Sequence, residues 1–307
     1  MNPRLFLLGL LVTGVFGLTG CKTGRVNVSR DVYDPLTMDP VTRDSTNPPR
    51  LIELALQSAG SRLNGIFYLP AGPGPHPVVV LLHGNPGNER NLDVAQALRR
   101  AGYGVLFFNY RGSWGSGGSF SRLHALEDAH AALDFVSSST TRARYGIDST
   151  RIALIGHSMG GWIALLTAAQ DQRVRCVTAL DFVNTGARGR RLQNDAAYDS
   201  AVTVEHNGLT APGGPYRGEG GGAALVAEMK KNAESWDVNR TASALRNRPV
   251  LLIAAVNGAE QDSFAASMGA SGAPLLTAQI WKTDHSFSDR RVALARTIVD
   301  WMRRSCR

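Results

Sequence analysis

The segment Gly156-His157-Ser158-Met159-Gly160 has the residue types of a serine nucleophile held in a sharp turn. The apolar run 152–155 precedes it and the run 161–169, which has helical spacing, follows it. A nucleophile between a strand and a helix needs small neighbours, and the two glycines meet that need. The backbone N–H of Met159 would then point toward the oxygen of a bound carbonyl group, where the helix start adds positive potential. The pattern therefore predicts that Ser158 is a nucleophile rather than part of an ordinary tight turn.

This turn resembles the nucleophile turn of the α/β-hydrolase superfamily, and the resemblance extends over about residues 60–305. A second match is His83-Gly84-Asn85-Pro86-Gly87, which follows the apolar run 78–82 and resembles the oxyanion loop of that family. The resemblance implies that the backbone N–H groups of Asn85 and Met159 together stabilise the oxyanion of an acyl-transfer reaction.

A third match is the segment 109–118, which reads Asn-Tyr-Arg-Gly-Ser-Trp-Gly-Ser-Gly-Gly. It resembles the loop at this place in the prolyl-oligopeptidase-like and dienelactone-hydrolase-like branches of the family. Its glycines permit a tight loop at the rim of a pocket. Trp114 either lines that pocket or packs beneath the insertion described below.

The general base is expected near the C-terminus, because the family order is nucleophile, acid, histidine. His285 follows the apolar run 275–281 and precedes the helically spaced run 292–302. The carboxyl ends of parallel strands share one sheet edge, so His285 is expected at the edge that carries Ser158. The remaining histidines have ordinary interpretations, as a loop member, the variable residue of the turn, helix residues or loop residues: His83, His157, His124, His130, His76 and His206.

The acid of the triad is harder to place. The resemblance puts it just after the apolar run 250–256, where the segment continues Asn-Gly-Ala-Glu-Gln-Asp and is longer than usual by a few residues. Asp262 is the first expectation and Glu260 the second. Asp181, after the run 174–180, is the third, used by a minority of the superfamily. Each of these carboxylates could instead be solvated or cap the helix expected near 263–268.

These parts imply a Ser-His-Asp triad that cleaves carboxylic esters through an acyl-enzyme intermediate. A serine peptidase of the prolyl-oligopeptidase-like type is the alternative that the loop 109–118 favours, although the chain lacks room for a propeller domain. Two hypotheses without catalysis also stand. One is a non-catalytic binding lipoprotein on a hydrolase scaffold, supported by the irregular acid segment, and the second is a structural envelope lipoprotein. The expected partner is a small-molecule or peptide carbonyl substrate, whose identity the sequence does not reveal.

The elements that must position these residues alternate between strand and helix. Continuous apolar strands that alternate with helices indicate a mostly parallel sheet covered on both faces, which is the α/β-hydrolase architecture. The expected strands are 51–57, 66–69, 78–82, 105–108, 152–155, 174–180, 250–256 and 275–281, and the expected helices are 91–100, 123–136, 161–169 and 292–302.

One stretch interrupts the alternation. Residues 184 to about 247 are rich in glycine and contain one credible helix, near 223–232. An insertion of this length between two core strands suggests a lid over the pocket. A disordered surface excursion is the alternative for part of it.

The N-terminus has the pattern of an export signal. Residues 1–20 have one charged residue, Arg4, and an apolar run too short to span a bilayer comfortably. The ending Leu-Thr-Gly-Cys resembles the bacterial lipobox, which implies lipidation at Cys21 and a membrane anchor. Residues 21–50 are expected to form a flexible tether and 51–307 the hydrolase domain. Lys22 after the cysteine favours the outer membrane, on its periplasmic side or surface, in a cell that has one.

Composition excludes several classes. The chain has 307 residues, 43% hydrophobic and 19% charged, which is globular rather than disordered. The net charge of +8 is scattered, without the basic tract of a nucleic-acid-binding arm. No metal-ligand spacing or Walker loop is present, so no cofactor is expected. Cys176 and Cys306 either pair in an oxidising compartment or leave Cys176 as a buried thiol.

Overall fold

The computed structural model describes residues 33–256 and 258–306. Their strands form one sheet in the order β1-β2-β4-β3-β5-β6-β7-β8. Neighbouring strands run antiparallel from β1 to β4 and parallel from β4 to β8. The strands are β1 (Arg50–Ser58), β2 (Ser61–Leu69), β3 (His76–Leu82), β4 (Gly104–Phe108), β5 (Ile147–His157), β6 (Val174–Leu180), β7 (Val250–Ala254) and β8 (Leu276–Ile280).

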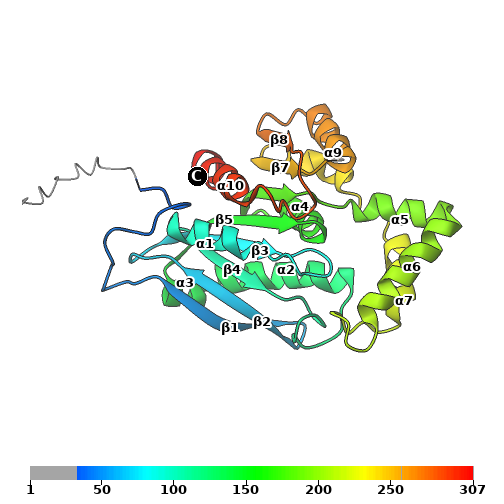
Figure 1. The fold of residues 1–307 in the computed structure, drawn as a ribbon, viewed down its shortest axis with the longest axis horizontal. Coiled ribbons are helices and arrows are strands. Elements are labelled where there is room, and N and C mark those ends of the chain that lie inside the picture. Colours follow the sequence, from blue (N-terminus) through cyan, green and yellow to red (C-terminus); the bar gives the residue numbers. More distant parts are fainter. Residues whose placement is uncertain (1–32, 257, 307) are drawn as a thin grey trace, which may run out of the picture. The chain divides into compact units, whose positions relative to one another are not determined.

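Helices cover both faces of this sheet (Figure 1). The first face carries α1 (Leu92–Arg100) and α10 (Arg291–Ser305), and the second carries α2 (Arg122–Ser137), α4 (Met159–Gln170) and α9 (Ala259–Ala270). A short helix, α3 (Ser139–Tyr145), links α2 to β5.

Two hydrophobic clusters lie on opposite faces of the sheet, and successive strand residues alternate between them. In β3, Val79 and Leu81 pack toward α1 and α10, whereas Val78 and Val80 pack toward α2 and α4. Because both faces are buried, the central strands are apolar at every position rather than at every second one. This is why the sequence shows them as continuous apolar runs.

The insertion between β6 and β7 is more helical than the sequence suggested. It contains α5 (Thr185–Asn194), α6 (Ala196–Thr210), α7 (Gly221–Lys231), a 3₁₀ turn η1 (Val238–Thr241) and α8 (Ala242–Leu245). Figure 1 shows α5, α6 and α7 gathered at one side of the sheet. The expectation of a single helix was wrong because Asn184 and Asp195 are N-caps: each side chain accepts a hydrogen bond from an N–H group of the first helical turn.

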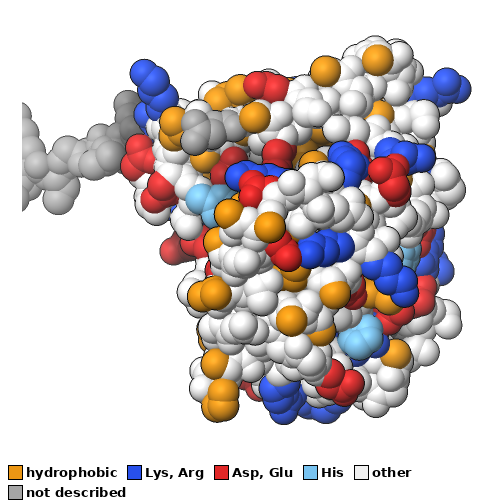
Figure 2. Space-filling model, turned by 90° about the vertical axis from the view of Figure 1, so that its right-hand side faces the viewer, with side chains coloured by type: hydrophobic (Ala, Val, Ile, Leu, Met, Phe, Trp, Pro, Cys, Tyr) orange, Lys and Arg blue, Asp and Glu red, His pale blue; other side chains and the backbone are white. Residues whose placement is uncertain are grey.

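The loop between α6 and α7 joins the insertion to the segment 109–118. Arg217 donates its N–H to Gly112 O at 2.7 Å, and its carbonyl accepts the N–H of Phe120 at 2.7 Å. The rings of Phe120 and Tyr216 stack at 3.7 Å between centroids. Figure 2 shows the outer face of the insertion, where basic and acidic side chains are intermixed. Ion pairs such as Lys230–Asp199 account for that mixture.

Segments near both ends of the described chain are attached to the folded core. Cys176 on β6 forms a disulfide with Cys306, directly after α10, so the pairing left open by the sequence is present. Near the N-terminal end, Asp34 forms an ion pair with Arg296 of α10 at 2.8 Å.

The expected signal peptide and Cys21 lie outside the described residues. In the part of the chain that is described, no helix is long and apolar enough to cross a membrane.

Candidate active site

Ser158 lies in a strained turn between β5 and α4. Its backbone has φ 55° and ψ −120°, a conformation that non-glycine residues rarely adopt. A Cβ on Gly156 would lie 2.0 Å from Gly160 O, and one on Gly160 would lie 2.1 Å from Leu82 O. Ser158 N–H donates to Leu180 O at 2.9 Å. The two glycines let the turn close, and the bond to β6 holds the serine at the carboxyl edge of the sheet.

His285 lies in the loop between β8 and α10, at the same sheet edge. Its Nδ1 is 2.5 Å from Oδ2 of Asp181. The carboxylate of Asp284 accepts the N–H groups of Ser286 and Ser288, and Phe287 is buried beneath the loop. The loop is therefore stabilised by hydrogen bonds to its own backbone and by the burial of Phe287. The side chain of His285 itself is 51% exposed.

Asp181 is the carboxylate that contacts the histidine. It follows β6 directly and has φ 40°. Its N–H donates to Ile253 O at 2.7 Å, and its Oδ1 accepts the N–H of Ala255 at 2.8 Å. Both contacts come from β7 and the residue after it. Asp181 is thus fixed by the neighbouring strand, with its second carboxylate oxygen directed at His285.

The structure places the two preferred acids elsewhere. The helix α9 begins at Ala259, so Glu260 and Asp262 occupy its first turn. Asp262 is exposed. Glu260 accepts the N–H of Asn184 at 2.6 Å, and burial raises the pKa of Glu260. Of the three carboxylates considered from the sequence, the structure therefore brings Asp181, the third choice, to His285.

The expected oxyanion loop packs against Ser158. A Cβ on Gly84 would lie 2.8 Å from the Cβ of Ser158. His83 is fully buried and donates from Nδ1 to Gly84 O at 2.8 Å, and burial lowers its pKa to about 4, so the ring is neutral. Met159 is the first residue of α4, where backbone N–H groups have no acceptor within the helix. The segments of Asn85 and Met159 thus both adjoin Ser158.

His157 has a role that the sequence did not reveal. Its Nε2–H donates to the carbonyl oxygen of His285 at 2.7 Å, and the two rings lie 4.6 Å apart. Burial, together with the positive charge that His285 can carry, lowers the pKa of His157 to about 4. The neutral ring therefore fastens the loop of His285 to the turn of Ser158. The variable position of the motif offered no signal for this contact.

Trp114 lines a pocket beside the oxyanion loop. Its indole N–H donates to Pro86 O at 2.7 Å, and the Arg90 guanidinium lies 4.6 Å from its ring. A pocket of about 410 Å³ lies between this loop and the insertion. Trp114, Pro86, Leu209 and Pro215 contribute its apolar walls. Trp114 thus lies against the insertion and lines a pocket whose walls do not include Ser158, Asp181 or His285.

A second pocket, of about 380 Å³, lies on the acid side of the site and is lined by Asp181, His285 and the start of α9. Among the described residues, no group of three histidine, cysteine or acidic side chains could hold a metal ion. The side chains that the structure brings to this edge are a serine, a histidine and a carboxylate: Ser158, His285 and Asp181.

The chain is similar in sequence or in fold to several known proteins. An uncharacterized protein of Mycobacterium tuberculosis is 29% identical over 189 residues, which is 61% of this chain and 63% of that relative. A Pyrococcus horikoshii acylaminoacyl peptidase has a TM-score of 0.62 at 16% identity, over 85% of this chain and 42% of that one. A Pyrococcus furiosus esterase has a TM-score of 0.60 at 17% identity, over 84% and 92%.

The two solved structures share the fold expected from the sequence, an eight-stranded, mostly parallel sheet with helices on both faces. Residues 79–303 match the sequence pattern of a single family. That span contains Ser158, Asp181, His285 and the oxyanion loop. The chain belongs to the alpha/beta hydrolase family.

Proposed function

We propose that this hydrolase cleaves carboxylic esters with Ser158 as nucleophile, His285 as general base and Asp181 as the acid that orients it. The observation that carries the proposal is the 2.5 Å contact between His285 Nδ1 and Asp181 Oδ2, at the sheet edge where Ser158 occupies its strained turn. Because the carboxylate accepts a hydrogen bond from Nδ1–H, the neutral imidazole has its proton on Nδ1 and none on Nε2. This is the tautomer that can accept a proton from the serine.

The reaction follows from these positions. His285 accepts the proton of Ser158 as Oγ attacks the carbonyl carbon. The charge that develops on the carbonyl oxygen is stabilised by the N–H groups of Met159 and Asn85, each such donor being worth about 2.7–4 kcal/mol in comparable sites. His285 then protonates the leaving alcohol, and water activated by the same histidine releases the acid from Ser158.

The preference for esters over peptides rests on chemistry. An alcohol leaves more readily than an amine, so an ester places a smaller demand on the exposed His285 as proton donor. A serine peptidase remains the rival within the same mechanism, and the structural neighbours include an esterase and a peptidase.

The test is hydrolysis of a panel of p-nitrophenyl esters and of acylated peptide anilides by the full-length protein. We expect ester turnover that Ser158→Ala abolishes and that Ser200→Ala, a change at an exposed serine of α6, leaves intact. Turnover of the anilides alone would favour the peptidase. Absence of both, with no labelling of Ser158 by a fluorophosphonate, would favour a non-catalytic binding lipoprotein.

We also propose that the protein is exported and anchored to the cell envelope through lipidated Cys21. The disulfide between Cys176 and Cys306 supports the proposal, because structural disulfides persist in oxidising compartments outside the cytosol. Incorporation of radiolabelled palmitate into the wild type but not into Cys21→Ser is the expected result. Equal labelling of both, or of neither, would refute the anchor.

A further inference from the structure

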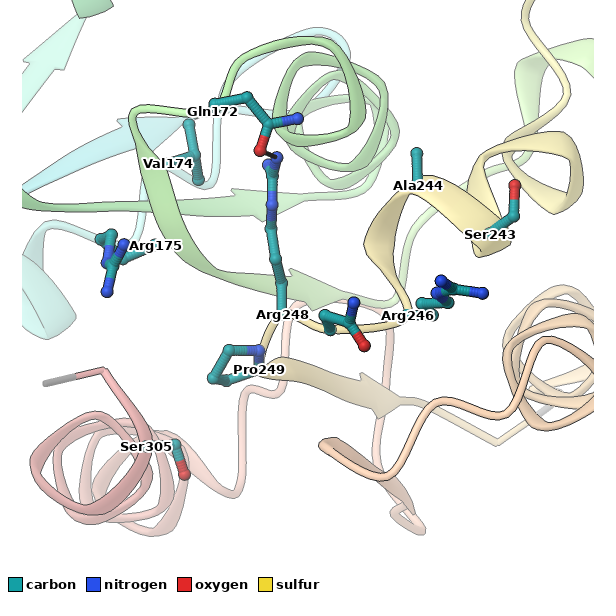
Figure 3. A pocket seen from close by; sticks show the side chains of 10 residues that line it. Gln172, Val174, Arg175, Ser243, Ala244, Arg246, Arg248, Pro249 and Ser305 are labelled. Carbon is teal, nitrogen blue, oxygen red and sulfur yellow. Dashed lines mark hydrogen bonds between the residues drawn. The ribbon is translucent and has the colours of Figure 1, made fainter.

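A further pocket of distinct chemistry lies at the opposite edge of the sheet from Ser158. It has a volume of about 680 Å³ and is formed where β6 and β7 begin, beside the last turn of α10. Three arginines and no acidic residue line it, together with Gln172, Val174, Ser243, Ala244, Asn247, Pro249 and Ser305. Figure 3 shows Arg248 between Arg175 and Arg246, which lie on either side of it.

Arg248 is a buried cation held by neutral groups. It is 9% exposed, and its guanidinium donates to Asp171 O at 3.0 Å, to Gln172 Oε1 at 2.5 Å and to Ala168 O. Burial lowers the pKa of Arg248; the Asp171 carboxylate opposes this, and the positive charge of Arg175 adds to it. These contacts fix the guanidinium in place but leave its charge without a bonded anion.

The two flanking arginines have no acidic partner among the residues that the structure describes. Arg175 and Arg246 are exposed, and no carboxylate of residues 33–256 or 258–306 lies within ion-pair distance of either. The carboxylate of Asp171 is already engaged by Arg173 at 2.6 Å. Three neighbouring positive charges repel one another, and a bound anion would relieve that repulsion.

We propose that this pocket binds a phosphate group, carried by a phosphate mono- or diester. Guanidinium groups match phosphate oxygens with paired, charge-assisted hydrogen bonds, which makes arginine clusters typical of phosphate recognition. Ser243, Asn247 and Ser305 add neutral hydrogen-bond donors around the arginines. The site is separate from the hydrolase machinery and does not depend on the reaction proposed there.

The test is isothermal titration of the full-length protein with inorganic phosphate at constant ionic strength, set with chloride. We expect saturable binding that Arg175→Gln/Arg246→Gln weakens by at least about tenfold. Both side chains are exposed, so the double variant should fold, and unchanged ester hydrolysis or unchanged thermal unfolding will verify this. Arg248 is left intact because its buried contacts are structural.

The matched control is Arg142→Gln/Arg144→Gln, which removes two exposed charges from α3. Wild-type affinity in this control, with loss in the pocket variant, supports a local site. Equal weakening in both variants would attribute binding to net charge and overturn the proposal, as would the absence of binding by the wild type. Titration with a short-chain phosphatidylglycerol below its micelle concentration identifies the source: tighter binding than inorganic phosphate indicates a lipid headgroup, and equal or weaker binding indicates a free phosphate compound.

Discussion

At the scale of single residues, the site depends on two residues that are not glycine and yet have positive φ. Ser158 has φ 55° and Asp181 has φ 40°. Such conformations cost about 1–3 kcal/mol each and persist only where the surroundings enforce them. Ser158 is held by the bond to Leu180 O and Asp181 by its bonds to Ile253 O and Ala255 N–H. Adjacent strands of the sheet thus enforce the conformations of the two residues to which we assign the roles of nucleophile and acid.

Asp181→Asn is expected to lower kcat/KM by about 10⁴-fold, because the amide would favour the wrong tautomer of His285. Asp262→Asn is the matched control, since it removes the same charge from an exposed position in α9. The measurement is kcat/KM for ester hydrolysis by the two variants and the wild type across a range of pH. Near-wild-type rates for Asp181→Asn, with a large loss for Asp262→Asn, would return the acid to α9.

Gly84→Ala is expected to destabilise the protein by about 1–3 kcal/mol, because the added methyl group would press on Ser158 Cβ at 2.8 Å. Labelling by a fluorophosphonate should slow as the serine is displaced. Gly269→Ala is the control: it lies in α9 with no atom within 4 Å of the added Cβ, and it should stabilise the helix by about 0.5–1 kcal/mol. Urea unfolding and labelling rates test the pair. Wild-type labelling in Gly84→Ala would contradict the close packing.

At the scale of elements, the insertion is attached to the core through a buried polar contact. Arg122, at the start of α2, donates from Nη2 to Nε2 of His206 on α6 at 2.7 Å. His206 in turn donates from Nδ1 to Val202 O. Glu228 of α7 accepts the N–H groups of Arg122 and Leu123, which caps α2 from the insertion. Residues of the insertion therefore accept hydrogen bonds from the first turn of α2, both from its backbone N–H groups and from the side chain of Arg122.

His206→Ala is expected to lower the free energy of unfolding by about 1.5–3 kcal/mol, because it leaves the buried Arg122 guanidinium without its acceptor. The insertion should also become more sensitive to limited proteolysis. His130→Ala is a matched control on α2, where the side chain is 35% exposed and its contacts are a 3.3 Å hydrogen bond with Gln170 and a 3.9 Å approach to Asp171. Equal stability of the two variants would show that the buried contact contributes little.

At the scale of the whole molecule, three buried histidines are expected to make the fold sensitive to acid. Burial lowers the pKa of His83, His157 and His206 from 6.5 to about 4 each. The unfolded chain binds these protons at a higher pH than the folded chain does, so protonation favours unfolding. The stabilisation is complete above about pH 6.5 and is lost progressively as the pH falls toward 4.

Urea unfolding measured at pH 7.5, 6, 5 and 4 tests this expectation. The free energy of unfolding should decline across the lower part of that range. His206→Gln keeps a hydrogen-bonding side chain but does not titrate, so its decline should be shallower than that of the wild type. A flat profile in the wild type would show that the three rings do not govern acid stability.

The sheet and the turn that contains Ser158 could be predicted from the local properties of the sequence. Continuous apolar runs specify a sheet buried on both faces, and the glycines around Ser158 specify a turn that only small neighbours permit. The prediction of His285 depended in addition on the resemblance, because the order of triad residues in the family directed attention to a histidine after the last apolar run. In the insertion, Asn184 and Asp195 are residue types typical of helix N-caps, so the starts of α5 and α6 could have been predicted. These two helices lack a strong apolar stripe, however, and the glycine-rich composition of the segment favoured a loop instead.

Only the tertiary structure decided which carboxylate meets His285. Glu260 and Asp262 follow β7 in sequence, but the immediate start of α9 directs them into a helical turn. Asp181 is 104 residues from His285 along the chain and reaches it because β6, β7 and β8 are parallel neighbours in the sheet, so the loops after β6 and β8 lie at the same edge. The pairing of Cys176 with Cys306, 130 residues apart, and the gathering of three arginines opposite the active edge have the same origin. Side-chain spacing along a chain reports on one element, whereas the packing of separate elements determines which side chains meet.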